Sequence, residues 1–359
     1  MAINANVRHY FLEAYTPCGH ISLMPDLTAG CLCTYQLTGN AGLDKSTFIK
    51  LMGIQLSDRR HDVDYVRQAR DPEALAGLFL PGARICLFDC DGFGESAEDW
   101  IAGQDEADCR REREGLRVRI DLGECLHKSK WELKRQEIDS LLIKQRDLES
   151  ERDRLLVHEY LSSRDEGSAR LVQTLLRQMA RSEFPRFFYN LQGAEEAYSD
   201  EIRGVLDFIK QNKVSFCFLH ALMNEGWANY APRFLRNYDR ICIEDEGETD
   251  TVLHEILGEI KSLGQKIEIV LHPVFPFRVI GIVFPWKNLA IWKGNPVKLE
   301  EQGLKSRHGT ELVRVLEEIR RVRQSVKSQV HECVSVRRLD EARNDLMSDI
   351  LGQIKSRVE

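Results

Sequence analysis

The chain has 359 residues, of which 43% are hydrophobic and 30% charged, and its 50 basic and 57 acidic side chains give a net charge of -7. This length suits about two domains, and the composition is that of a globular protein rather than a disordered or collagen-like one. The acidic balance disfavours nucleic-acid binding, which uses basic surfaces. No run approaches the ~20 apolar residues that span a bilayer, and the first residues lack the zones of a secretory signal. We therefore expect a cytoplasmic protein that contacts no membrane.

Ten cysteines are spread along the chain, and none forms a Cys-x-x-Cys pair. Structural zinc sites usually present two close pairs of Cys or His ligands within a compact segment. The spacing instead predicts reduced cysteines that pack as small apolar side chains.

The sequence contains an internal repeat. Sliding the chain against itself by 204 positions places residues 77–81 on 281–285, and residues 85–88 on 289–292. Upstream, an offset of 207 places Phe11 on Phe218. Apolar, glycine and proline positions stay in step over these stretches. We therefore predict a duplicated fold.

Each copy shows the same succession of predicted elements. An apolar, β-rich run leads through a polar turn into a helical run and then into another strand. Such alternation predicts a mainly parallel α/β sheet, because parallel strands need crossover connections. These runs cover residues 31–37, 46–55 and 63–66 in the first copy, and 240–243, 251–263 and 267–271 in the second.

Long charged helical segments follow both copies. Residues 124–162 contain no proline, and a turn near residues 163–167 leads into a second apolar helical stripe at 171–179. Residues 312–350 repeat this theme. We therefore expect two tandem α/β units, residues 1–195 and 196–359, each followed by a long antiparallel helical hairpin. These hairpins are the predicted surface for a protein partner.

A glycine-rich turn follows the first predicted strand. It reads Gly-Asn-Ala-Gly-Leu-Asp-Lys-Ser-Thr and leads into an apolar helix start. This order resembles the Walker A loop of P-loop NTPases, Gly-x-x-x-x-Gly-Lys-Ser/Thr. In that loop, backbone N–H groups and a helix N-terminus surround phosphates, the Lys adds a cation, and the hydroxyl binds magnesium. The resemblance assigns ATP phosphates to Gly39, Asn40, Ala41, Gly42, Lys45, Ser46 and Thr47.

Asp44 departs from this motif, which has glycine before the lysine. A carboxylate there adds bulk and a negative charge beside an anion. At ~4 Å the repulsion is on the order of 1 to 4 kcal/mol, which weakens binding by about tenfold to a thousandfold. The sequence therefore predicts a degenerate nucleotide site.

A second segment resembles the Walker B strand. Residues 85–88 are apolar and end in Asp89, and in Walker B strands such a carboxylate holds magnesium directly or through water. The resemblance thus implies a Mg²⁺ ion held by Ser46 and Asp89. Asp89 as a simple strand end before a turn stays open as the alternative.

The second copy has lost this motif. Asp250 takes the place of Lys45, and Lys293 takes the place of Asp89. The matching turn, residues 244–250, is strongly acidic and cannot surround a polyphosphate directly. We expect no nucleotide site there.

The whole pattern resembles a group of bacterial tandem P-loop ATPase-like proteins, in which both halves begin with an Arg-His-x-Phe-like strand and carry a Walker A loop. Residues 8–11 and 71–89 carry this resemblance together with the glycine-rich turn. It implies a P-loop NTPase fold, but no catalytic base or arginine finger can be assigned.

Two functions stay open. One is an ATP-binding, ATPase-like protein with a single degenerate site and slow or no hydrolysis. The other is a catalytically dead pseudo-ATPase that acts as a structural or regulatory interaction module. Nucleic-acid binding ranks third.

Overall fold

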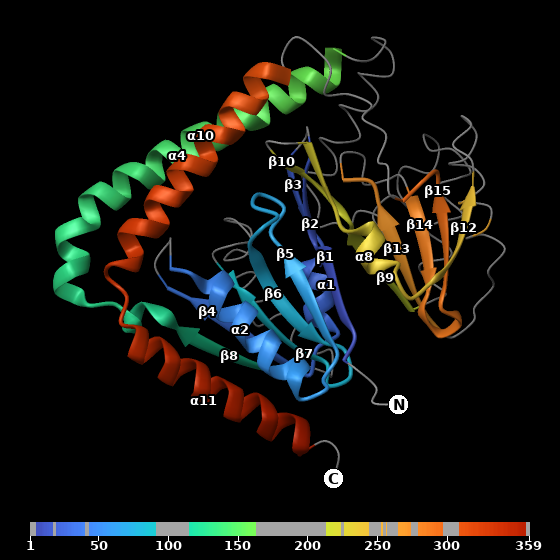
Figure 1. Cartoon of the computed structure of the whole chain (residues 1–359), viewed down its shortest axis with the longest axis horizontal. Helices are drawn as coiled ribbons and strands as arrows, with labels where there is room; N and C mark the ends of the chain where they lie inside the picture. The colour runs from blue at the N-terminus through green and yellow to red at the C-terminus, as the bar shows by residue number, and fades with distance from the viewer. Residues whose placement is uncertain are drawn as a thin grey trace, which may run out of the picture. The chain divides into compact units, whose positions relative to one another are not determined.

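The chain folds into two compact units, each of which combines separate stretches of sequence. The first unit contains Met1–Arg8, Thr28–Arg152 and Glu311–Glu359, and the second contains His9–Leu27 and Asp153–Thr310. Both ends of the chain therefore contribute to the first unit. The boundary expected between residues 195 and 196 lies outside the described residues. The computed structural model (Figure 1) describes residues 5–16, 19–39, 43–90, 115–162, 213–223, 226–243, 253, 256, 265–273, 279–296 and 309–356.

The first unit is built on a mixed sheet with the strand order β5-β6-β7-β4-β8, and β1 (Val7–Phe11) is the neighbour of β5. β4 pairs in parallel with both β7 and β8. β6 is antiparallel to β5 and β7. All six residues of β4 are buried. The strands are β4 (Cys33–Thr38), β5 (Val63–Arg67), β6 (Leu75–Leu80), β7 (Ile85–Asp89) and β8 (Leu116–Asp121).

Helix α2 (Lys45–Asp58) contacts β5, β6 and β7 of this sheet. Its apolar side chains share one core with those of α11 (Val336–Lys355), which also contacts α2 and the short helix η2 (Leu122–Cys125). The Tyr35 hydroxyl on β4 donates a 2.7 Å hydrogen bond to Asp349 on α11. The C-terminal helix thus completes the core of the first unit.

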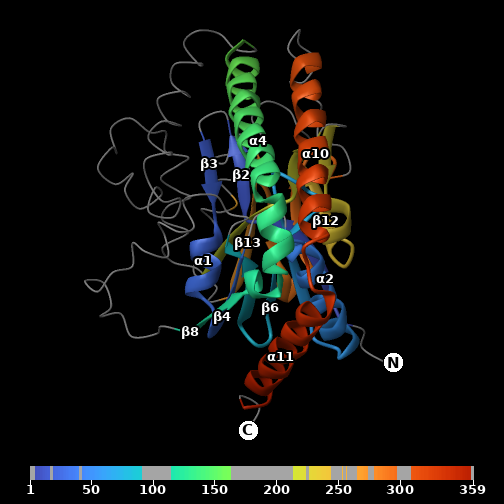
Figure 2. The same cartoon turned by 90° about the vertical axis from the view of Figure 1, so that its left-hand side faces the viewer.

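Helices α4 (Lys128–Ser162) and α10 (Gly309–His331) run antiparallel, side by side (Figures 1 and 2). Lys144 on α4 pairs with Glu318 on α10 at 2.6 Å, and Gln329 donates a 2.9 Å hydrogen bond to Glu137. Polar side chains therefore connect helices that lie far apart in the sequence. Among the helices that the structure describes, none combines the length and apolar character needed to cross a bilayer.

The expected parallel-sheet units, each followed by its own helical hairpin, are wrong, although the α/β character holds. Short connections join β5, β6 and β7, and short connections permit antiparallel neighbours. α4 pairs with α10 from the other end of the chain, and α11 points away from α10 (Figure 1). α11 does so because it buries Leu346, Met347 and Ile350 in the core of the first unit. The helix expected at residues 171–179 lies outside the described residues.

The second unit contains a mixed sheet with the order β12-β15-β14-β13-β9, and β9 pairs with the last residue of β1 through Phe11 and Phe218. Two hairpins, β2–β3 and β10–β11, also belong to this unit. Its strands are β2 (Glu13–Thr16), β3 (Gly19–Ser22), β9 (Lys213–Phe218), β10 (His220–Met223), β11 (Gly226–Asn229), β12 (Asp239–Ile243), β13 (Lys266–Leu271), β14 (Val279–Phe284) and β15 (Leu289–Lys293). Its short helices are α8 (Ala231–Phe234) and η4 (Pro285–Lys287), and most of α1 (Met24–Ala29) also lies in it.

The strand pairings of the two sequence copies are related by the same offsets that relate their sequences. Gly77 pairs with Phe88, and Gly281 pairs with Trp292, each shifted by 204 positions. The β5–β6 pair is irregular after Val66, and β13–β14 is irregular at the matching place. A Cβ atom on Gly281 would lie 2.4 Å from the Trp292 ring, and one on Gly77 would lie 2.7 Å from the Leu87 carbonyl oxygen. The shared glycine is therefore required by the close approach of the neighbouring strand.

His220 is a buried titratable group of the second unit. Its side chain, at the start of β10, is 2% exposed and lies near Trp292, with ring centroids 6.5 Å apart. Burial lowers the pKa of His220 to about 4. The folded unit therefore keeps this imidazole neutral.

We predict that His220 makes folding stability depend on acid. An unfolded chain takes up a proton at His220 as the pH falls through about 6.5, whereas the folded chain does so only near pH 4. The free energy of unfolding should fall across this window, by up to about 3 kcal/mol from this residue. Urea unfolding of the wild type and His220→Asn at pH 7, 5.5 and 4 measures it. The difference in unfolding free energy between the wild type and His220→Asn should shrink as the pH falls. Unfolding free energies that change in parallel with pH would contradict the prediction.

Candidate functional site

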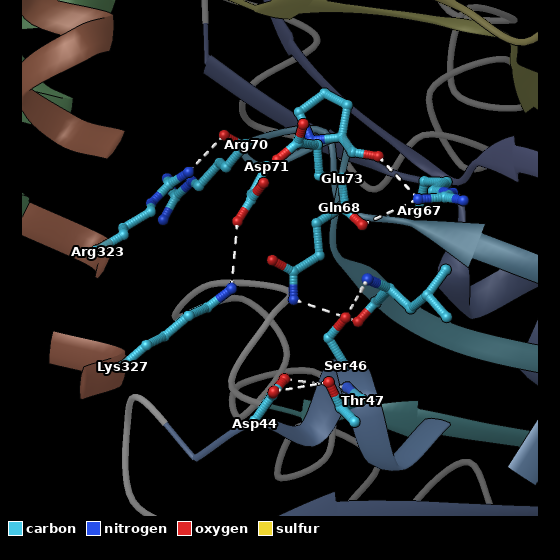
Figure 3. A network of polar contacts seen from close by, with 12 residues as sticks. Asp44, Ser46, Thr47, Arg67, Gln68, Arg70, Asp71, Glu73, Arg323 and Lys327 are labelled. Carbon is cyan, nitrogen blue, oxygen red and sulfur yellow. Dashed lines mark hydrogen bonds and ion pairs between the residues drawn. The ribbon is translucent and has the colours of Figure 1, made fainter. Parts of the chain in front are cut away.

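The α2 N-terminus (residues 43–47) is closed by the side chain of Asp44. One Asp44 oxygen accepts the Thr47 backbone N–H at 3.0 Å, and the other accepts the Thr47 hydroxyl at 2.6 Å (Figure 3). The first turn of a helix leaves N–H groups without backbone partners, and an acidic N-cap satisfies one of them and favours the helix dipole. Asp44 thus supplies an anion where the resembled motif binds a phosphate.

Lys45 is directed into the protein, with only 3% of its side chain exposed. Its Nζ atom lies 2.9 Å from Oδ1 of Asp89, which is the last residue of β7. β4 and β7 are parallel and pair through Leu37 and Asp89, so the carboxyl ends of both strands meet where α2 begins. The structure therefore brings Lys45 and Asp89 together as a buried ion pair.

The two expected magnesium ligands already have other partners. The Ser46 hydroxyl oxygen accepts the Leu75 backbone N–H at 2.9 Å, which ties α2 to the start of β6. The Asp89 carboxylate faces the Lys45 ammonium, so a metal ion there would have to displace a cation. Within the described ranges, no three His, Cys, Asp or Glu side chains converge as metal ligands. This arrangement does not fit a preformed Mg²⁺ site.

Gly39 has a structural reason to be glycine. Its φ of 142° lies in the region that L side chains rarely adopt. A Cβ atom here would lie 2.9 Å from the Gly123 backbone nitrogen and 2.9 Å from Leu43 Cδ1. The close approach of η2 to the end of β4 therefore accounts for this glycine without a phosphate. Asn40, Ala41 and Gly42 lie outside the described residues.

The β5–β6 loop (residues 68–74) connects the α2 N-terminus to helix α10 (Figure 3). At one end, Leu75 donates its backbone N–H to Ser46. On the other side, Arg323 of α10 donates a 2.5 Å hydrogen bond to the Arg70 carbonyl, and Lys327 lies 3.7 Å from Asp71. The loop is therefore held by side chains from both α2 and α10.

Glu149 on α4 lies between two arginines of this network. Its carboxylate is 2.7 Å from Arg323 and 3.1 Å from Arg70, and it accepts a 3.0 Å hydrogen bond from Gln145. Burial would raise the pKa of Glu149, but the two guanidinium groups outweigh burial and lower it. The carboxylate is thus held in its charged form between α4, α10 and the β5–β6 loop.

Sequence reasoning missed this cluster. Runs of charged residues on a helix usually form a solvated face, but the Arg323 side chain is only 15% exposed. Leu141, Leu148 and Leu155 recur every seven residues, and Glu149 follows Leu148, so its nearness to the apolar side of α4 was a weak signal. Nothing in the sequence joins it to Arg70, 79 positions earlier, or to Arg323, 174 positions later.

The chain matches no family model, no curated protein and no solved structure. Its function must therefore be argued from the contacts themselves. At the α2 N-terminus, both the helix end and the lysine are neutralised by carboxylates of the chain. In the second copy, the counterpart of Asp89 is Lys293, the last residue of β15. The counterpart of the glycine-rich turn, the acidic turn of residues 244–250, lies outside the described residues.

We predict that Glu149→Gln destabilises the first unit by about 2 to 3 kcal/mol, because two partly buried guanidinium groups lose their counter-ion. The matched control is Glu318→Gln, which breaks the more exposed Lys144 pair on the same two helices. This control should cost much less, because exposed ion pairs contribute little to stability. Urea unfolding at pH 7 compares the two variants. Equal losses of unfolding free energy would show that the buried cluster stabilises the unit no more than the exposed pair does.

Proposed function

We propose that this chain is a pseudo-ATPase: a structural or regulatory interaction module that keeps a P-loop-like turn without a ready nucleotide site. The observation that carries the proposal is the double neutralisation at the α2 N-terminus. Asp44 caps the helix end that would receive a phosphate, and Asp89 pairs with Lys45. Both positive features that attract a polyphosphate are already satisfied.

The two carboxylates differ in how strongly they oppose a nucleotide. Separating Lys45 from Asp89 leaves two buried charges and costs about 3 to 5 kcal/mol if nothing replaces the pair. ATP with magnesium could replace it, because phosphate would pair with Lys45 and the metal ion with Asp89. No such replacement partner exists for Asp44, since an incoming phosphate carries the same sign of charge and repels its carboxylate. Asp44 is therefore the main barrier in this proposal.

The interaction role is supported by the helices. Polar side chains of α4 and α10 hold the β5–β6 loop, which in turn contacts Ser46. A partner that binds this helix pair would thereby contact the same network as the α2 N-terminus. We keep the cytoplasm as the proposed location, because the spacing of the cysteines in the sequence is typical of reduced side chains that pack as small apolar groups.

Weak ATP binding is the second candidate function. It is favoured by the placement of Lys45, Ser46 and Asp89, which come from the same strand ends and helix start as in the resembled motif. If hydrolysis occurred, the chain would be an ATP hydrolase, with a catalytic base still to be assigned. This candidate requires Asp44 to move away from Thr47.

Calorimetric titration with ATP and Mg²⁺ tests the proposal on the full chain. The wild type and Lys45→Ala should give the same negligible heat at millimolar ATP. Asp44→Gly should bind at least about tenfold more tightly than the wild type, because a repulsion of 1 kcal/mol or more is removed. Losing the cap to glycine should cost only a few tenths of a kcal/mol, so the fold should persist.

Asp44→Asn is the matched control, because it keeps a capping oxygen and removes the charge. Binding gained by both Asp44 variants would assign the barrier to charge, whereas a gain only with glycine would assign it to bulk. Lys45-dependent binding by the wild type would overturn the pseudo-ATPase proposal and favour the second candidate.

A further inference from the structure

Strand β12 of the second unit has a strand on only one side among the described residues. It pairs with β15 on one side, and it ends the strand order among the described residues. Its first four residues are exposed, and the Ile241 side chain at its centre is 52% exposed. Exposed edge strands offer unpaired N–H and C=O groups to another chain. The exposed residues of this strand, Asp239, Arg240, Ile241 and Cys242, are therefore accessible to another chain.

The internal repeat shows what covers the equivalent edge in the first unit. β4 pairs in parallel with β7 as β12 pairs in parallel with β15. β4, however, has β8 on its other side, paired in parallel from Cys33 with Leu116 to Thr38 with Asp121. With β8 in place every residue of β4 is buried, whereas β12 is exposed.

The connections that follow β7 and β15 differ in length. Residues 90–127 lie between β7 and α4 and include β8 and η2, whereas residues 294–308 lie between β15 and α10. Within the part of the chain that the structure describes, no strand lies beside β12 at the position that corresponds to β8.

We propose that the edge of β12 binds an extended segment of a partner protein, running parallel to β12 as β8 runs parallel to β4. Addition of a strand to a sheet edge is a recurring mode of peptide recognition, in which backbone hydrogen bonds give affinity and side chains give specificity. This surface belongs to the second unit, so the proposal is independent of nucleotide binding.

The charges of β12 define the partner segment. In the register of β4 and β8, Arg117 lies opposite Thr34, and the residue of β12 that corresponds to Thr34 is Arg240. A second copy offering its own β8 would therefore place Arg117 opposite Arg240, and like charges directly opposite are unfavourable. The partner segment instead carries a basic residue opposite Asp239, an acidic residue opposite Arg240 and an apolar residue opposite Ile241.

Two peptides test this specificity. Both contain residues 115–122 of this chain with Leu116→Lys, which places a base opposite Asp239, and one also carries Arg117→Glu. Fluorescence anisotropy with the full chain should show the Arg117→Glu peptide binding about threefold to tenfold more tightly. The protein variant Arg240→Glu should reverse this order. Because Arg240 is exposed, the variant should keep the wild-type circular dichroism and unfolding midpoint.

Cys242 provides a test of register and direction. It is exposed, and the repeat register places it opposite position 119 of the peptide. Neighbouring strands are about 4.8 Å apart, which is within reach of a disulfide. The peptide is made with Arg119→Cys as a mixed disulfide with thionitrobenzoate. The Cys242 thiolate then attacks the peptide sulfur, forms the new disulfide and releases the thionitrobenzoate anion.

This peptide should link to the chain faster than one with Val118→Cys, and Cys242→Ser should abolish the reaction. Three results would each overturn the proposal. They are an absence of peptide binding, an order of peptide affinities that Arg240→Glu leaves unchanged, and a Val118→Cys peptide that forms its disulfide with Cys242 faster than the Arg119→Cys peptide does. Sedimentation of the full chain supplies a further check. Self-association that Arg240→Glu changes would show that the edge pairs with a second copy, and it would also overturn the proposed partner.

Discussion

The start of α2 favours a negative charge, and the chain supplies it through Asp44. Free N–H groups at a helix start favour an anion, whether it is a ligand or a side chain. Thr47 gives both its backbone N–H and its hydroxyl to this carboxylate. The neighbouring Lys45 side chain pairs with Asp89 at the end of β7. The same helix start that resembles a phosphate site is thereby made stable without a phosphate.

This helix start is connected to a larger polar network that joins distant parts of the sequence. Ser46 holds the first residue of β6, and the β5–β6 loop accepts Arg323 from α10. Glu149 adds α4 to the same cluster. Charged groups in such partly buried places are held by several partners at once, which restricts how the helices can sit on the loop. The first unit therefore depends on both ends of the chain.

The two sequence copies kept their strand registers but diverged at the glycine-rich turn and at the outer edge of the sheet. Gly77 and Gly281 both accommodate a close neighbouring strand, so packing has preserved them. In contrast, Lys45 has Asp250 as its counterpart, and the edge protected by β8 in one copy is exposed at β12 in the other. Packing constrains a sheet interior more tightly than its edges and turns, because interiors tolerate little change in volume.

The sequence by itself determined the local pattern, since periodicity and turn residues act over short distances. This pattern comprises the strand-helix-strand succession of the first copy, the strands of the second copy, the offsets between the copies and the Lys-Ser-Thr helix start after β4. The sequence could not determine strand direction, because parallel and antiparallel neighbours bury similar apolar runs. It also could not find the Glu149 cluster or the pairing of α4 with α10. Those contacts form only when segments 79 or more positions apart come together, and burial together with charge pairing selects them from many possible partners. Tertiary structure likewise decided that Asp44 caps α2, because a carboxylate before a helix can cap it or repel a ligand.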